Sequence, residues 1–226
     1  MIHVLYEDNH ILCVEKPVNV PVQEDDSHDA DLLSMCKQYL KEKYNKPGNV
    51  YLGLVHRLDR PVGGVMVFAK TSKAASRLSE AVRTHTIKKE YIAIVDGIIS
   101  QKQGTLVDYL KKDTRKNRVT VASAQEGKKS ILHYEVIDQK KHKTLVHITL
   151  ETGRSHQIRV QFSSRNLPLV YDQRYNTHTK KGQIALYAYQ LTFMHPVKKE
   201  PIVVTCFPQP KDPWNLFEVE KCLSRK

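Results

Sequence analysis

Several residue types are scarce in this chain of 226 residues. It holds nine glycines and ten prolines, which argues against long flexible linkers. No apolar run approaches the ~20 residues that a membrane span requires, and the first eight residues lack the charged-then-apolar order of a signal peptide. Neither a Walker-type loop nor a Gly-x-Gly-x-x-Gly loop is present, which argues against a nucleotide-driven or dinucleotide-dependent reaction. We therefore expect a soluble, cytoplasmic protein.

Cysteine is also rare, and its spacing is uninformative for metal binding. The four cysteines lie far apart, form no Cys-x-x-Cys pair and have no histidine at zinc-ligand spacing. We therefore expect reduced thiols and no metal site. The residues concerned are Cys13, Cys36, Cys206 and Cys222.

Positive charge, in contrast, is abundant. Lysine and arginine number 36 against 24 aspartates and glutamates, a formal net charge of +12 with the histidines neutral. Such an excess favours a polyanionic partner, nucleic acid first and an anionic membrane surface second. Many of these residues fall on predicted turns and strand edges, namely Lys111, Lys112, Arg115, Lys116, Arg118, Lys128, Lys129, Lys140, Lys141 and Lys143.

The hydrophobic pattern predicts more strands than helices. Adjacent strands are often joined by short turns, so we expect an α+β fold with a mixed, mostly antiparallel β-sheet core and flanking helices, in a single domain over residues 1–226. The predicted strands are residues 2–7, 10–15, 64–69, 91–95, 118–122, 131–137, 144–150, 186–193 and 202–206. The predicted helices are residues 31–44, a helix capped by Ser72, residues 154–165 and a C-terminal helix capped by Asp212 with Pro213 at its first position.

Residues 54–64, Leu-Val-His-Arg-Leu-Asp-Arg-Pro-Val-Gly-Gly, form the most informative cluster. One carboxylate, Asp59, stands there among basic side chains, and cationic neighbours favour the ionised form of a carboxylate. The proline and glycines indicate a loop just before a buried strand, a usual place for site residues. An ion pair in a polar surface turn is the alternative interpretation. The basic neighbours are His56, Arg57 and Arg60.

A second cluster, Thr-Gly-Arg-Ser-His-Gln-Ile-Arg, occupies residues 152–159. Arg154 falls at the start of the predicted helix, where the macrodipole disfavours a cation by roughly 0.3–1 kcal/mol. We therefore expect an anionic group to compensate Arg154. Asp59, an RNA phosphate and the neighbouring Glu151 are the three candidates.

Both clusters resemble signature blocks of the RluA-type RNA pseudouridine synthase family. Three motifs occur in the family's order, and the third, Thr-Gly-Arg-x-His-Gln-Ile-Arg, matches at every specified position. The resemblance runs from about residue 4 to residue 205, so we expect the catalytic domain without the small N-terminal RNA-binding domain that many relatives carry. The first motif is similar to residues 56–59, 63–64 and 69–70, the second to residues 88–93 and the third to residues 152–159.

The chain also departs from the family pattern at several positions. Family members usually have Thr-Ser-Gly at residues 62–64, and a histidine where this chain has Gln161 and Tyr187. These changes leave the expected catalytic residues untouched. They bear on the choice of RNA substrate more than on the reaction type.

The resemblance implies an isomerase that converts specific uridines of ribosomal or transfer RNA to pseudouridine, without metal or cofactor, in the central catalytic cleft of the pseudouridine synthase fold. It implies that Asp59 is the catalytic carboxylate, that Arg154 pairs with Asp59, and that Tyr91 packs against the target base. Asp59 would act either as a nucleophile or as a base at the sugar, where positive charge develops. The expected RNA contacts are His56, Arg57, Arg60, Lys88, Lys89, His156, Gln157 and Arg159, of which the last three would contact RNA or only fix the helix.

Two other functions compete with this interpretation. A noncatalytic RNA-binding protein on the same scaffold would keep the basic surface, but would have little reason to retain Asp59, Tyr91 and Arg154 together. A metal-dependent nuclease would need a carboxylate cluster at metal-ligand spacing, which the sequence lacks. The expected partner is RNA, with no membrane contact and no obligate protein partner, so we expect a monomer.

Overall fold

The computed structural model describes residues 2–224. The chain divides into two compact units, and the division falls within strands β5 and β10. Unit 1 holds Met1–Lys89 and Ala188–Cys206, and unit 2 holds Glu90–Tyr187 and Phe207–Lys226. A single catalytic domain over residues 1–226 stays a prediction.

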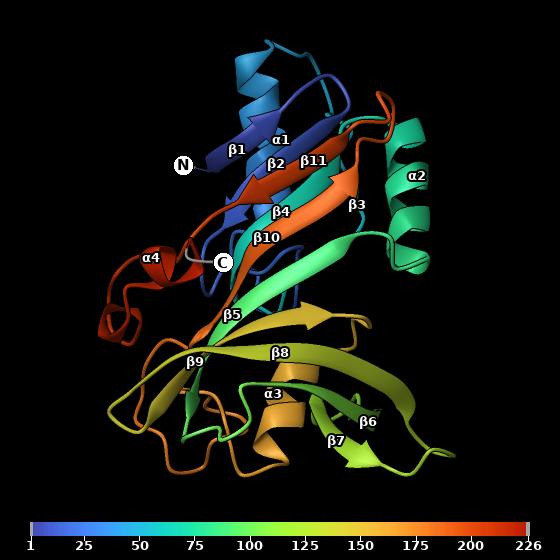
Figure 1. Ribbon diagram of the computed structural model, residues 1–226. Helices are drawn as coiled ribbons and strands as arrows, with labels where there is room; N and C mark the ends of the chain where they lie inside the picture. Colours follow the sequence, from blue (N-terminus) through green and yellow to red (C-terminus); the bar gives the residue numbers. More distant parts are fainter. Residues whose placement is uncertain (1, 225–226) are drawn as a thin grey trace. The chain divides into compact units, whose positions relative to one another are not determined.

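Unit 1 is built on a sheet whose strands follow the order β1-β2-β4-β10, with β3 paired to β4 and β11 paired to β10 (Figure 1). The β1–β2, β2–β4, β3–β4 and β10–β11 pairs are antiparallel. Every residue of β4 is buried, as its continuous apolar run predicts. The strands are β1 (His3–Glu7), β2 (Ile11–Lys16), β3 (Gly53–Leu54), β4 (Gly63–Ala69), β10 (Leu186–Met194) and β11 (Pro201–Thr205).

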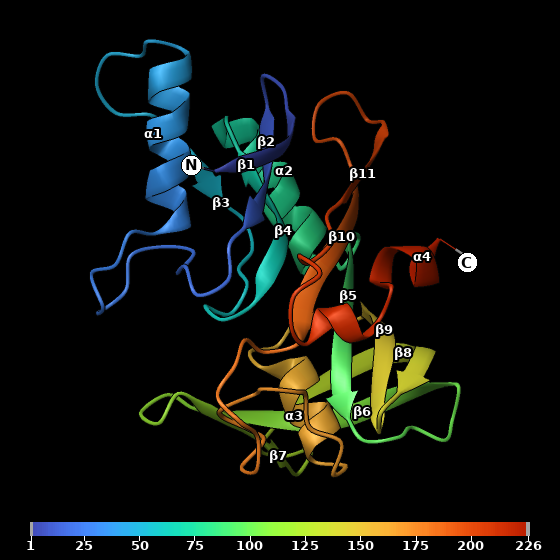
Figure 2. The ribbon, with the colours of Figure 1, turned by 90° about the vertical axis from the view of Figure 1, so that its left-hand side faces the viewer.

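Two helices of unit 1, α1 (Leu32–Lys43) and α2 (Ser72–Arg83), flank this sheet (Figure 2). Helix α1 begins after Asp31, whose carboxylate accepts a hydrogen bond from the backbone N–H of Ser34 at 3.0 Å, so the predicted helix is confirmed. The prediction that Ser72 caps α2 is wrong by one residue. The extended backbone of Thr71 directs its hydroxyl to the N–H of Ala74, which makes Thr71 the cap.

The core of unit 1 lies between α2 and the sheet. Ala74 and Leu78 of α2 are buried against a cluster of apolar side chains from several strands. This packing fixes the face of the sheet on which α2 lies. The strand residues of the cluster include Ile11 and Cys13 of β2, Val65 and Val67 of β4, Leu191 and Phe193 of β10 and Val204 of β11.

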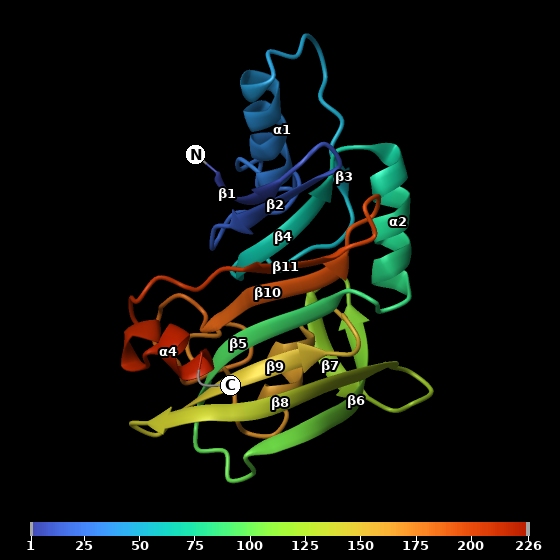
Figure 3. The ribbon, with the colours of Figure 1, turned by 45° about the horizontal axis from the view of Figure 1, so that its top comes forward.

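Unit 2 contains a sheet of the order β5-β9-β8-β6-β7, in which β5, β9, β8 and β6 lie side by side (Figure 3). The predicted pairing of adjacent strands through short turns is confirmed by the antiparallel β6–β7 and β8–β9 pairs, and β6 and β8 also pair in the antiparallel sense. Strand β6 was not predicted, because most of its side chains are polar and only two are buried. The strands are β5 (Lys88–Asp96), β6 (Gln103–Asp113), β7 (Arg118–Ala122), β8 (Lys128–Lys140) and β9 (Lys143–Leu150).

Two helix predictions in unit 2 need correction. Helix α3 spans Gln157–Ser163, so Arg154 lies ahead of the helix and not at its start. His156 has a left-handed backbone (φ 52°), which separates residues 152–155 from the first helical turn. The C-terminal helix is a 3-10 turn, η1 (Trp214–Leu216), followed by α4 (Val219–Leu223), because the buried Phe217 is extended and interrupts it.

The predicted α+β class with mostly antiparallel strand pairing is confirmed. Within residues 2–224 all four cysteines lie outside disulfides. Over the same residues, no helix is both long enough and apolar enough to cross a lipid bilayer.

Candidate active site

The loop that carries Asp59 lies in unit 1, between β3 and β4. The N–H of Val62 donates to the backbone carbonyl of Asp59 at 2.9 Å, which closes a tight turn. Leu58 and Val62 are buried on either side of this turn, whereas Asp59 is half-buried. The loop is thus anchored by its apolar residues, while Asp59 stays partly exposed.

Lys16, at the end of β2, holds this loop through a hydrogen bond from its side chain. Its side chain is fully buried, and its Nζ donates to the carbonyls of Pro17 at 2.8 Å and Arg60 at 3.0 Å. Burial lowers the pKa of Lys16 to about 7, while the negative charge of Asp59 acts in the opposite direction. The amine of Lys16 is therefore positively charged below about pH 7 and a neutral hydrogen-bond donor above it. Its positive charge interacts with the carboxylate of Asp59.

Lys16 lies outside both motif clusters of the sequence. Every residue of β2 is buried except Glu15, which is partly exposed. The sequence feature that could indicate the role of Lys16 is a lysine at the end of an apolar strand, directly before a proline. Such a lysine has to find acceptors inside the protein.

Arg60 stands next to Asp59 in sequence, but its guanidinium contacts a different loop. It donates to the carbonyl of Asn19 at 3.2 Å and to the hydroxyl of Ser27 at 2.9 Å. It also pairs with the carboxylates of Asp25 and Asp29. The structure therefore assigns Arg60 to the acidic loop that precedes α1.

His56 is uncharged. Its Nε2 accepts a hydrogen bond from the N–H of Val67 at 3.1 Å. Burial and the nearby charge of Lys89 lower the pKa of His56 to about 3. His56 therefore links the loop to β4 as a neutral acceptor, and the expectation that it adds positive charge near Asp59 is wrong. Arg57, the third basic neighbour, is exposed.

Gly64 is the second residue of β4, the strand that follows the loop, and cannot be replaced without a clash. Its φ is +128°, and a Cβ built on it would lie 2.1 Å from the carbonyl oxygen of Ala188. Glycine at this position satisfies both the backbone conformation and the close approach of β10. The Gly-Gly pair thus sets how the Asp59 loop enters the sheet.

Residues 152–157 of unit 2 carry Arg154 and are fastened to β8 by neutral groups. The hydroxyl of Thr152 accepts the N–H of Ile131 at 2.8 Å, and the amide Nε2 of Gln157 donates to the carbonyl of Ile131 at 3.0 Å. The Oε1 of Gln157 accepts the backbone N–H of Arg154 at 3.0 Å. Gln157 therefore holds the segment at both of its ends.

Arg154 itself is exposed. Its Nε donates to the carbonyl oxygen of Lys129 at 3.4 Å, which is a long hydrogen bond. This contact involves only the Nε of the guanidinium. Because Arg154 lies outside helix α3, the macrodipole does not explain its need for an anion. The predicted anionic partner of Arg154 stays a prediction.

Arg159 and His156 are held inside unit 2. Arg159 is buried and donates from Nε and Nη2 to the two carboxylate oxygens of Asp172, at 2.9 and 2.7 Å. Asp172 also accepts the backbone N–H groups of Arg174 and Tyr175. The Nδ1 of His156 is 2.8 Å from the hydroxyl of Tyr175. Of the two roles that the sequence left open for these residues, the geometry favours fixing the helix.

Strand β5 carries Tyr91, the third residue of the predicted catalytic set. Tyr91 is 8% exposed. It follows Glu90, which is buried and lies 3.1 Å from Nε2 of His147 on β9. Lys88 is exposed, whereas Lys89 is half-buried and burial lowers its pKa. These contacts make the start of β5 a rigid support for Tyr91.

The basic turns of unit 2 are almost entirely exposed. The ten lysines and arginines predicted there are all exposed except Lys143, which is half-buried. Lys111 pairs with Glu126 at 2.7 Å, and Lys140 pairs with Asp138 at 3.0 Å. Exposed pairs of this kind are weak, so both lysines can exchange these carboxylates for phosphate groups.

Comparison with known proteins places these motifs in a family. Residues 10–164 match the RNA pseudouridylate synthase family, a range that contains Asp59, Tyr91 and Arg154. The chain is 33% identical over 212 residues to the ribosomal large subunit pseudouridine synthase C of Buchnera aphidicola, covering 89% of this chain and 65% of that protein. It is 32% identical over 219 residues to the uncharacterized RNA pseudouridine synthase YlyB of Bacillus subtilis, covering 95% of this chain and 71% of that protein.

A solved structure is similar in fold. Human RNA pseudouridylate synthase domain containing 4 superposes with a TM-score of 0.78 at 21% identity, covering 92% of this chain and 89% of the human chain. The fold that the resemblance implied is therefore confirmed. Together with the match over residues 10–164, this establishes that the chain belongs to the RNA pseudouridylate synthase family.

Proposed function

We propose that this protein isomerises uridine to pseudouridine in RNA, with Asp59 as the catalytic carboxylate. The observation that carries the proposal is the half-buried Asp59 on a rigid loop, within the range of residues that matches the family. The buried amine of Lys16 and the carboxylate of Asp59 influence each other electrostatically.

The reaction breaks the bond between the sugar C1′ and N1 of uracil. The base then turns, C5 bonds to C1′, and the proton of C5 is lost while N1 gains a proton, so there is no net redox change. Positive charge develops on the sugar as the first bond breaks. An ionised carboxylate stabilises this charge, either by bonding to C1′ or by removing a sugar proton.

The roles of the other two residues follow from their places in unit 2. Tyr91 offers a fixed aromatic ring, which suits packing against the uracil ring. Arg154 offers an exposed guanidinium on a backbone that Gln157 holds in place. In the proposed mechanism Arg154 pairs with Asp59 and orients it.

A uridine in folded RNA has to leave the base stack to react, at a cost of a few kcal/mol that is lowest in loops. We propose that Arg57, which is exposed, fills the space left by the base. Lys88 and the basic turns of unit 2 would contact phosphates. His56 and Arg60 would act as RNA contacts only where the bound RNA replaces their present contacts, and the half-buried Lys89 only through its exposed part.

Ribosomal RNA is the substrate class we favour. The Buchnera relative is described as acting on the ribosomal large subunit, and this chain spans 65% of that protein's length. Transfer RNA is the second candidate. We also propose that the protein is cytoplasmic and works as a monomer without an obligate protein partner, and that its reaction uses neither metal nor cofactor.

The test is tritium release from RNA labelled at C5 of uracil, prepared from cells that lack the enzyme. The wild-type protein should release tritium, and Asp59→Asn should not, because the amide cannot stabilise positive charge as a carboxylate does. Binding of both proteins to the RNA is measured in parallel. Asp26→Asn, an exposed aspartate of the same unit, is the matched control and should retain full activity.

The alternative function is a noncatalytic RNA-binding protein on the same scaffold. It would bind RNA with the same affinity in the wild type and in Asp59→Asn, and would release no tritium from ribosomal or transfer RNA. Release by Asp59→Asn at the wild-type rate would instead remove Asp59 from the mechanism.

A further inference from the structure

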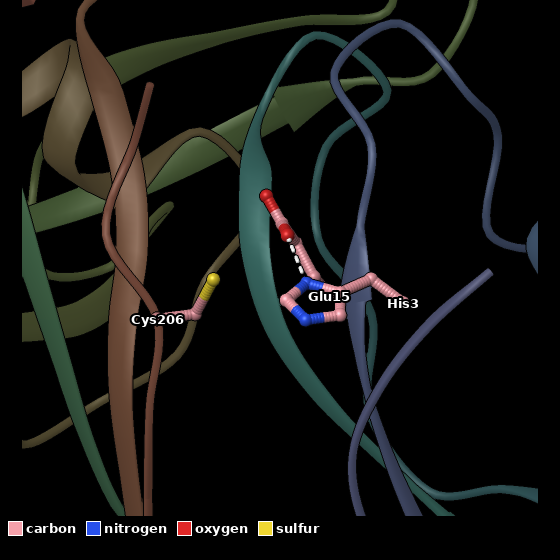
Figure 4. A group of neighbouring side chains, drawn as sticks. All are labelled: His3, Glu15 and Cys206. Atoms are coloured by element: carbon pink, nitrogen blue, oxygen red, sulfur yellow. Dashed lines mark hydrogen bonds and ion pairs between the residues drawn. The ribbon is translucent and has the colours of Figure 1, made fainter. Parts of the chain in front are cut away.

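Three potential metal ligands meet on the surface of unit 1. They are the imidazole of His3, the carboxylate of Glu15 and the thiol of Cys206, and their ligand atoms all lie within 4.8 Å of one another (Figure 4). The Nδ1 of His3 is 2.7 Å from Oε2 of Glu15, and the sulfur of Cys206 points toward the same space. The proposed reaction uses none of these residues.

The strand pairing explains why they meet. His3 and Glu15 are direct cross-strand partners in the antiparallel β1–β2 pair, which puts their side chains on the same face. Cys206 comes immediately after β11, and its N–H donates to the carbonyl of Tyr189 at 2.8 Å. The backbone of all three ligands is therefore held by strand hydrogen bonds. Cys206 follows His3 by 203 residues and Glu15 by 191, which explains why the spacing of the cysteines indicates no metal site.

We propose that His3, Glu15 and Cys206 bind one Zn²⁺ ion. Imidazole, carboxylate and thiolate are the three side-chain ligands of protein zinc sites, and the thiolate disfavours the hard cations Mg²⁺ and Ca²⁺. Zinc bonds of 2.0–2.3 Å in a tetrahedron separate the ligand atoms by roughly 3.3–3.6 Å. Ligand atoms that lie within 4.8 Å of one another have to approach by about 1 Å to reach these separations.

The exposure of the three side chains determines how Zn²⁺ would reach them. The side chain of His3 is 65% exposed and that of Glu15 is 25% exposed, so the ion can enter from solvent and take water as its fourth ligand. Binding replaces the contact between Nδ1 of His3 and Glu15 with two bonds to the metal. The Cys206 thiol loses its proton to solvent as the zinc–sulfur bond forms, so binding should strengthen as the pH rises from 6 to 8.

Bound zinc would link the β1–β2 hairpin to the chain segment that follows β11. An ion that binds only the folded state stabilises it. Zinc would also shield the Cys206 sulfur from oxidation, because a metal-bound thiolate is less available to an oxidant. The site would thus serve stability and redox protection of unit 1, and its test does not depend on the proposed isomerase activity.

The experiment measures Zn²⁺ uptake by the full chain, by competition with a chromogenic chelator and by elemental analysis after gel filtration. We expect one Zn²⁺ per chain and a higher melting temperature with zinc, but not with Mg²⁺. Cys206→Ser should weaken binding by at least about tenfold, since even loss of a group that only supports a ligand costs that much. His3→Ala, at an exposed position, should do the same without disturbing the fold.

Cys222→Ser is the matched control, because Cys222 is as exposed as Cys206 but lies outside the cluster. It should bind zinc as the wild type does. The proposal is overturned if the wild type takes up no stoichiometric zinc. It is also overturned if Cys206→Ser and His3→Ala bind zinc with wild-type affinity, or if Cys222→Ser loses binding to the same extent as they do.

Discussion

The loop that carries Asp59 and the segment that carries Arg154 are held by different kinds of contact. The first rests on the amine of Lys16, a buried group whose pKa is about 7. The second rests on the neutral side-chain amide of Gln157. Helix α3, which follows this segment, is held by the ion pair of Arg159 with Asp172. One part of the proposed site therefore rests on an amine that titrates near neutrality, whereas the other rests on a neutral side-chain amide.

The largest effect is expected from breaking the support of the Arg154 segment. Arg159→Ala leaves the carboxylate of Asp172 buried without its guanidinium partner. The free energy of unfolding should fall by about 3–5 kcal/mol, as for other buried pairs that lose one member. Urea denaturation measures this change. A loss below ~1 kcal/mol would mean that the Arg159–Asp172 pair does not hold α3.

Arg83→Ala is the matched control for that variant. Arg83 also donates from Nε and Nη2 to a carboxylate, that of Glu80, but both side chains are exposed. Exposed pairs of this kind contribute about 0.2–1 kcal/mol. The difference between the two variants measures the effect of burial on the same pair of chemical groups.

The next largest effect should come from removing the support of the Asp59 loop. Lys16→Met leaves the carbonyls of Pro17 and Arg60 without their buried donor, and should lower the free energy of unfolding by about 1–3 kcal/mol. The measurement is made at pH 9, where the amine of Lys16 is neutral in the folded protein and no buried charge is removed. Lys37→Met on α1 is the control and should change stability by less than ~0.5 kcal/mol.

The difference between the Asp59 loop and the Arg154 segment can be tested by measuring the free energy of unfolding from pH 7 to pH 9. In the unfolded chain Lys16 keeps its proton up to about pH 10.5, whereas in the folded protein it loses the proton above about pH 7. The unfolded state therefore binds more protons in this window, and stability should rise with pH by up to about 1.4 kcal/mol per pH unit. Lys16→Met should lack this rise, while Gln157→Leu should keep it. A wild-type curve that runs parallel to that of Lys16→Met would contradict the assignment.

The smallest effect concerns the basic turns. If these turns contact phosphates, log Kd for single-stranded RNA should change with log salt by roughly 0.7 for each contact. The double variant Arg115→Ala, Lys116→Ala should reduce this slope by up to about 1.4. The same pair of changes at Lys37 and Lys41 of α1 in unit 1 should leave the slope unchanged. Equal salt slopes for both double variants would mean that RNA binding depends on the net charge of the protein and not on contacts of these turns.

The sequence predicted those features that depend on local patterns. The apolar run of β4 and the cap at Asp31 are set by neighbouring residues, and both are confirmed. Strand β6 was missed because its polar side chains point outward, so that its identity depends on pairing with β8 and β7. The cap of α2 was misplaced by one residue because serine and threonine are adjacent there.

The candidate site shows the same limit. The motifs indicated Asp59 and Arg154 directly, because each lies in a short characteristic stretch. The groups that anchor their segments from elsewhere are Lys16 and Ile131, which are 43 and 23 residues away along the chain, and only the folded sheet and loops bring them into place. Arg60 is the reverse case, since it adjoins Asp59 in sequence and yet pairs with Asp25 and Asp29.

The close approach at Gly64 has a genetic consequence. Every missense change of a glycine codon introduces a side chain, and here even a methyl group would be placed 2.1 Å from the carbonyl oxygen of Ala188. Gly48, with a φ of +75° and no neighbouring atom within 4 Å of a built Cβ, has no such barrier of space. Natural variation at codon 64 should therefore be synonymous wherever the protein is under selection, while codon 48 is free to drift toward asparagine or aspartate.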